Sequence, residues 1–104
     1  MSALIRGTTP TITFTFNTVS VSAMAVAYMT LNQGTELSNY DLSNATVDSE
    51  NNTLSWKLTQ EDTLALTQNK TVEIQCRYRL NDSSAGASKI YKVDAYRILK
   101  DGEI

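Results

Sequence analysis

The sequence predicts an all-β protein, an antiparallel β-sandwich of about seven strands, and three observations lead to that prediction. Several segments alternate between apolar and polar residues, which is the period of a half-buried strand. Clusters rich in Asn, Asp, Ser and Gly separate them at intervals of roughly eight to fourteen residues. The chain has 104 residues, enough for one hydrophobic core, so we expect a single domain over residues 1–104. A small closed barrel is the alternative architecture.

The first predicted strand, Thr11–Phe16, follows Pro10, which a strand tolerates best at its start. Its alternation turns Ile12, Phe14 and Phe16 toward the core and Thr11, Thr13 and Thr15 toward solvent. All six residues favour strands through branching or aromaticity. We expect this strand to lie at a sheet edge, where unpaired backbone groups can meet a partner chain.

The second predicted strand, Met24–Gln33, is apolar on both faces and is therefore expected to be central. One face carries Ala25, Ala27, Met29 and Leu31, and the other carries Val26, Tyr28 and Thr30. Two short strands follow at Thr35–Leu42, anchored by Leu37, and at Ala45–Asp48.

A hairpin is predicted around Asn51-Asn52, with Thr53–Leu58 as its second strand. Leu54, Trp56 and Leu58 point inward there. Thr59 is a good helix N-cap, and acidic residues follow it in the first turn, so a short helical turn is expected near residues 60–66. Such a turn needs tertiary packing to be stable.

Thr71–Leu80 is the clearest strand, with Val72, Ile74, Cys76, Tyr78 and Leu80 on its inner face. A turn at Asn81–Gly86 leads to a final strand, Ala87–Ala95, which pairs with it as a hairpin. Tyr91 and Val93 are its expected core residues. The ordered core is predicted to span about residues 5–97, with a polar C-terminal tail.

Composition argues against an enzyme. The chain has no His and a single Cys, which removes the commonest general base, an internal disulfide and a Cys-rich zinc site. Cys76 is expected to be a small buried hydrophobe. Glu61-Asp62 is the only adjacent acidic pair, and a hydrolase based on carboxylates alone is the weakest hypothesis. Asp41, Asp48 and Glu50 match no EF-hand spacing, so we expect no metal and no cofactor.

The net charge of −2 is too balanced to predict nucleic-acid or membrane binding. It is uneven: residues 1–69 sum to −4 and residues 70–104 to +2. No apolar run is long enough to cross a bilayer, and the N-terminus lacks the apolar core of a signal peptide. We therefore expect synthesis in the cytoplasm.

Arg77 and Arg79 share one face of a predicted strand, near Lys89 and Lys92 of its hairpin partner. Tyr28 or Tyr40 could lie among them. Three roles are open for this face: a solvated surface with cross-strand ion pairs, a contact between subunits, or a platform for single-stranded nucleic acid. The balance of charge disfavours nucleic acid. The predicted assembly surface comprises Thr11, Thr13, Thr15, Arg77 and Arg79.

Five stretches resemble small structural proteins of phages and prophages from Gram-positive gut bacteria: Ile5–Phe14, Ala27–Leu31, Leu54–Leu66, Ala87–Tyr91 and Ile98–Gly102. More distantly, the layout is similar to the immunoglobulin-like N-terminal domain of phage baseplate upper proteins. The resemblance covers nearly the whole chain and implies an immunoglobulin-like sandwich in a virion tail, baseplate or appendage. It supplies no catalytic residues.

The leading functional hypothesis is therefore a non-enzymatic virion protein that binds other virion proteins and itself. A small-molecule ligand is not expected. The alternative is a module that binds carbohydrate on a host surface, for which exposed Tyr or Trp side chains beside polar groups would be needed. Trp56 falls on a core-facing position and is expected to fill the core instead.

Overall fold

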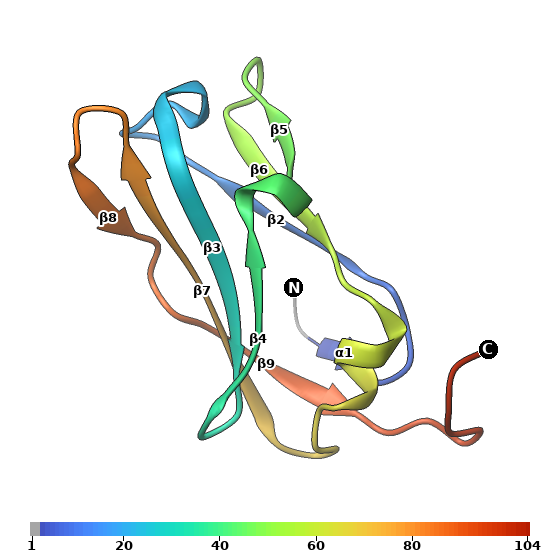
Figure 1. Ribbon diagram of the computed structural model, residues 1–104. Helices are drawn as coiled ribbons and strands as arrows, with labels where there is room; N and C mark the ends of the chain where they lie inside the picture. The colour runs from blue at the N-terminus through green and yellow to red at the C-terminus, as the bar shows by residue number, and fades with distance from the viewer. Residues whose placement is uncertain (1–2) are drawn as a thin grey trace.

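The computed structural model describes residues 3–104, which form nine strands, one α-helix and two 3-10 helices (Figure 1). In chain order these are β1 (Ala3–Ile5), β2 (Thr11–Thr15), η1 (Val21–Ala23), β3 (Met24–Asn32), β4 (Glu36–Asp41), η2 (Leu42–Asn44), β5 (Thr46–Asp48), β6 (Thr53–Lys57), α1 (Gln60–Leu64), β7 (Thr71–Leu80), β8 (Ala85–Ala87) and β9 (Tyr91–Tyr96). The protein is mainly β with one short α-helix, as the alternation predicts.

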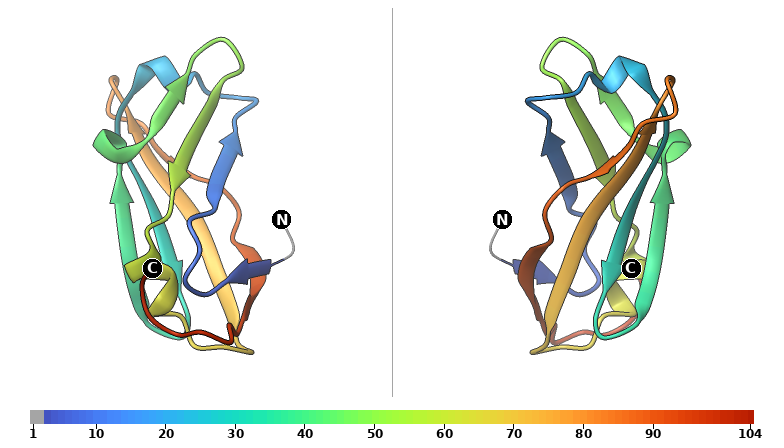
Figure 2. Two further views of the ribbon diagram at one scale, coloured as in Figure 1. Left: turned by 90° about the vertical axis from the view of Figure 1, so that its right-hand side faces the viewer. Right: turned by 90° about the vertical axis from the view of Figure 1, so that its left-hand side faces the viewer.

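The larger sheet has six strands in the order β1-β9-β7-β3-β4, with β8 also paired to β7. It curls along its length, and the smaller sheet lies beside it (Figures 1 and 2). The prediction of purely antiparallel pairing was wrong for one pair, because β1 runs parallel to β9 with Leu4 opposite Ala95. This pairing joins the two ends of the chain through three residues, too few to produce a detectable alternation.

The predicted strand count of seven was also too low. Besides the addition of β1, the strand expected over Ala87–Ala95 is divided into β8 and β9. The division occurs at Ser88, whose side-chain Oγ accepts from the Cys76 N–H at 3.0 Å and whose own N–H donates to the Cys76 carbonyl at 2.8 Å. These bonds pull the chain away from a regular ladder before Tyr91.

Strand β8 begins within the predicted turn Asn81–Gly86, and its central residue is Gly86. A Cβ at Gly86 would lie 2.5 Å from the Tyr78 hydroxyl, so glycine is required for Tyr78 to lie across β8. Tyr78 in turn meets Phe16 edge-to-face, with ring centroids 5.6 Å apart. Both rings are partly buried and close one end of the core.

The smaller sheet has the order β2-β6-β5 and is antiparallel throughout. The predicted hairpin is confirmed as β5–β6, and β2 is confirmed as an edge strand. Asn52 in the hairpin turn has a left-handed φ of 57°. Its amide donates to the carbonyls of Phe16 (2.6 Å) and Val19 (2.7 Å) and accepts from the Val21 N–H (2.9 Å). One turn residue therefore holds the chain that leaves β2.

The core lies between the two sheets and confirms most predicted inward positions. Trp56 is fully buried, and its indole N–H donates to the Asp41 carbonyl at 2.9 Å. Phe14 packs edge-to-face on it at 5.9 Å. The other fully buried positions predicted from alternation are Ala27, Met29, Leu31, Leu54, Val72 and Cys76.

Two predicted core positions were wrong. Leu37 is 38% exposed because it lies on the edge strand β4, and Tyr91 is 44% exposed because it lies at the start of β9, before the residues that pair with β1. Ala25 is exposed because the β3–β7 register shifts between Met24 and Val26, which places Met24 in the core instead.

The predicted helical turn is α1, which ends two residues earlier than expected. Thr59 caps it as predicted, with its Oγ1 accepting from the Asp62 N–H at 3.1 Å. The buried Thr63 hydroxyl donates to the Thr8 carbonyl, and Arg6 donates to the carbonyls of Leu64 and Leu66. These hydrogen bonds therefore connect the segment after β1 to α1 and to the loop that leads into β7. Residues 97–104 form no strand or helix.

Candidate functional site

The β2 edge carries the three predicted threonines. Thr11, Thr13 and Thr15 are exposed, while Ile12 and Phe14 between them are buried. Pro10 accepts from the Leu58 N–H, and the Phe16 N–H donates to Asn52, so the even-numbered residues are the ones bonded to β6. Because bonded positions alternate in an antiparallel ladder, the N–H and C=O groups of the three threonines point to the open side.

A groove runs beside this edge at the opening between the two sheets. This edge groove has a volume of about 300 Å³ and is lined by residues 12–15 of β2, Ile74 of β7 and residues 91–93 of β9, with Lys92 as its charged member. Phe14 and Tyr91 meet edge-to-face with centroids 6.0 Å apart, and the Lys89 ammonium lies 5.1 Å above the Tyr91 ring. The exposed Tyr91 ring is therefore accessible next to unpaired backbone groups, while the other apolar residues of the lining are buried.

The remaining edges of the part of the chain that the structure describes offer less. Strands β1, β5 and β8 have three residues each. Strand β4 has six, but it carries Glu36 and Asp41 and runs directly into η2. Short strands and charged residues both discourage strand addition. Strand β2 is the longest edge without a charge.

Arg77 and Arg79 lie on the other sheet, exposed on the outer side of β7, whose inner side carries the buried Cys76. The structure therefore separates the predicted assembly residues into two surfaces: the threonines on the smaller sheet and the arginines on the larger one (Figure 1). Of the two tyrosines considered beside them, Tyr28 is 48% exposed on the same outer face. Tyr40 is 7% exposed and belongs to the core.

A hollow on this outer face was missed by sequence reasoning. The outer hollow, of about 480 Å³, lies over β3 and β7 between β4 and β8. Strand register builds it, since Arg77 lies directly opposite Tyr28 and Arg79 opposite Val26. The sequence predicts Arg77 and Arg79 on one face and allows Tyr28 beside them, but nothing in it predicts that this face is hollowed.

The groups considered for catalysis have structural partners. Burial raises the pKa of the Cys76 thiol to about 11, which keeps it protonated and unreactive at neutral pH. Asp62 accepts from the Tyr40 hydroxyl, and burial together with this bond raises the pKa of Tyr40. Asp48 accepts from the N–H groups of Glu50 and Asn51 and from the Asn51 side chain, which lowers the pKa of its carboxyl.

Asp41 likewise accepts from Ser43 and caps η2, and the Ser43 hydroxyl contributes most to the lowered pKa of its carboxyl. Across residues 3–104, no three Cys, Asp or Glu side chains come together in a way that could hold a metal ion. The acidic side chains near turns act on the backbone of those turns.

Comparison with protein-family models found no match, and a search of curated proteins found no similar sequence. None of the helices within the described range, residues 3–104, has the length and apolar character needed to cross a membrane. The geometry of the β2 edge and the outer hollow is therefore the basis for the functional argument.

Proposed function

We propose that this protein is a non-enzymatic structural or accessory component of a phage or prophage virion, in the tail, baseplate or another appendage. It is made in the host cytoplasm and assembles through the β2 edge. The observation that carries the proposal is that edge: five uncharged residues, unpaired backbone groups at three threonines, and an edge groove of mixed polar and apolar lining beside them.

The strand order supports an immunoglobulin-like frame for this assembly role. In that fold one sheet has the order A-B-E-D and the other includes G, F and C, with C′ added in variable-type domains. The order β9-β7-β3-β4 corresponds to G-F-C-C′, and β2-β6-β5 corresponds to B-E-D. Within residues 3–104 no strand pairs with β2 on the side of strand A, and β1 pairs with β9 instead. A strand from a partner would occupy that place.

The partner that the edge fits best is a second copy of the chain. Two β2 strands can pair antiparallel about a twofold axis at Thr13, with Thr11 opposite the partner's Thr15. The residues with free backbone groups then face one another. Thr–Thr pairs are favourable across strands, and no like charges meet, because the strand carries none. The result is one continuous antiparallel sheet across two protomers.

Sedimentation velocity over a wide concentration range tests this assembly. We expect the wild-type protein to form a dimer and Thr13→Lys to stay monomeric, because its ammonium would face its own copy at the axis. Thr46→Lys is the matched control: Thr46 lies in the same row of the sheet, across Ser55, on the opposite β5 edge. It should dimerise like the wild type.

Two results would reject the β2 assembly: a wild-type protein that remains monomeric at every concentration, or equal loss of the dimer in both lysine variants. Mass spectrometry of purified phage particles tests the virion assignment separately. Absence of the protein from particles would remove that assignment and leave the dimer geometry unaffected.

A further inference from the structure

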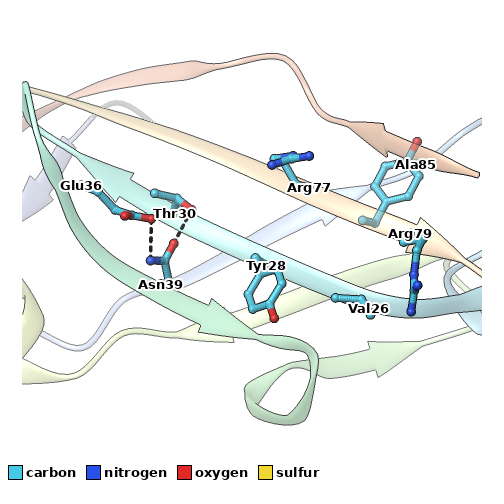
Figure 3. A pocket seen from close by; sticks show the side chains of 9 residues that line it. Val26, Tyr28, Thr30, Glu36, Asn39, Arg77, Arg79 and Ala85 are labelled. Atoms are coloured by element: carbon cyan, nitrogen blue, oxygen red, sulfur yellow. Dashed lines mark hydrogen bonds between the residues drawn. The ribbon is translucent and has the colours of Figure 1, made fainter.

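The outer hollow has a composition that the assembly role does not use. Tyr28 lies in its middle, Val26 and Arg79 lie toward one end, and Thr30 and Asn39 lie toward the other, with Arg77 alongside from β7 (Figure 3). Strands β4 and β8 flank it, so the lining comes from four strands. The hollow thus combines a largely apolar lining, which includes the Tyr28 and Tyr78 rings, with two cations.

Charge in the hollow favours an anionic ligand. Arg77 and Arg79 are both exposed and separated by one residue on β7, and the single ion pair found in residues 3–104 joins Arg6 to Asp101. Both guanidinium groups are therefore available to bind carboxylate, sulfate or phosphate oxygens. The acidic residue in the lining, Glu36, lies at the other end, and its Oε1 accepts from the Asn39 amide at 2.6 Å.

The other lining groups suit a sugar ring. The exposed Tyr28 ring offers an apolar face, and Val26 and Ala85 add apolar surface near it. At the far end, the Thr30 hydroxyl donates to Asn39 Oδ1 at 2.6 Å, and the Asn39 amide donates to Glu36. These two hydrogen bonds fix the Thr30 and Asn39 side chains. Such an oriented set of donors and acceptors is what recognition of several hydroxyl groups requires.

We propose that the outer hollow binds an anionic saccharide. Its acid group binds Arg77 and Arg79, its ring packs on Tyr28, and its hydroxyl groups face Thr30 and Asn39. A single-stranded nucleic acid fits less well, because it needs a continuous basic track with several stacking rings. Here the lining has two aromatic side chains, of which Tyr78 is only partly exposed, and Asp41 lies directly opposite Tyr28 on β4.

Titration of the full-length protein by two-dimensional NMR tests the proposal, with digalacturonic acid as the probe. We expect shifts confined to amides around Tyr28, Arg77 and Arg79. Arg77→Gln and Arg79→Gln should each weaken binding about tenfold, as expected for loss of a charged hydrogen bond. Arg97→Gln is the matched control, since it removes the same charge from the exposed tail outside the hollow. It should bind like the wild type.

Tyr28→Ala should weaken binding about fivefold, whereas Tyr28→Phe should keep it, because the ring face is retained. Binding of a sugar phosphate in place of the uronic acid would identify the acid group as phosphate. Equal binding of neutral digalactose, equal weakening by Arg97→Gln, or binding of only an oligonucleotide would each overturn the proposal. Thr13→Lys must leave sugar binding intact, so failure of the β2 assembly and failure of the hollow are distinguishable.

Discussion

The two longest edge strands, β2 and β4, are built in opposite ways. Strand β4 carries Glu36 and Asp41 and ends in η2, where Asp41 caps the backbone. Its inner side is fixed by the Trp56 N–H on Asp41 and by the Tyr40 hydroxyl near α1. Strand β2 has no charge, a free row of backbone groups and a groove beside it. One edge is thus protected against pairing, and the other is left available for it.

This contrast teaches that exposure of an edge does not by itself make an interface. Both strands are long enough to pair with another chain, yet only β2 lacks the charges that natural proteins place on edges to prevent it. Substitutions can disturb the protected β4 side, the open β2 side, or the core residue that joins them.

The largest effect is expected from Trp56→Ala, which breaks the link between the sheets. Trp56 lies opposite Ile12 of β2 and donates to Asp41 at the end of β4, so its loss affects both edges. Removal of a fully buried Trp should reduce the free energy of unfolding by about 4 kcal/mol. Chemical denaturation measures this. Trp56→Phe should lose less stability than Trp56→Ala, because it keeps an aromatic ring in the core. Equal losses in the two variants would mean that filling this volume with a ring contributes nothing.

Asn52→Ala should destabilise the open side next. Asn52 makes three side-chain bonds to the segment that leaves β2, and its φ of 57° is costly for alanine. We expect a loss of about 2 to 3 kcal/mol in the free energy of unfolding. Asn52→Gly removes the same bonds without the backbone strain, so it should lose about 1 kcal/mol less. If Asn52→Ala and Asn52→Gly have the same free energy of unfolding, backbone strain at this turn is not part of the cost.

Tyr40→Phe removes a single hydroxyl group from the protected β4 side. That hydroxyl donates to Asp62 and accepts from the Thr59 N–H at 3.2 Å, so its removal should cost about 1 kcal/mol at neutral pH. Because the pKa of Tyr40 is raised by burial and by Asp62, the native state keeps the proton while the unfolded state loses it above pH 10. Wild-type stability should therefore fall faster than that of the variant as pH rises above 10.

Denaturation curves at pH 8 to 11 measure this difference in slope. The pKa of Cys76 is also raised, to about 11, but the thiol is present in both proteins and cancels in the comparison. Parallel pH profiles would show that the Tyr40 hydroxyl has the same affinity for its proton in the folded and unfolded chain.

Sequence reasoning succeeded where structure is decided locally. Alternation located Leu54 and Trp56 in the core, Asn52 marked the hairpin turn, and Thr59 marked the start of the helix. Each of these depends on residues within a few positions of one another.

It failed where residues far apart in the chain decide the outcome. The β1–β9 pair joins residues about 90 positions apart, and the exposure of Tyr91 depends on where the opposite sheet stops. The outer hollow required the register that sets Tyr28 against Arg77. A single sequence contains the side chains of such a site but not the pairing that brings them together.

Thr13→Val should have the smallest effect on stability, and it tests whether the β2 edge pairs through its backbone. The Thr13 hydroxyl bonds the Ser55 hydroxyl at 2.9 Å on an exposed face, so its loss should change the free energy of unfolding by no more than about 0.5 kcal/mol. Valine keeps the branching that favours a strand and leaves the backbone N–H and C=O in place. If the edge assembles through its backbone, sedimentation should show the valine variant dimerising at least as well as the wild type. A dimer lost in Thr13→Val but retained in Thr46→Val would instead assign the contact to the threonine hydroxyls and rule out strand addition as its basis.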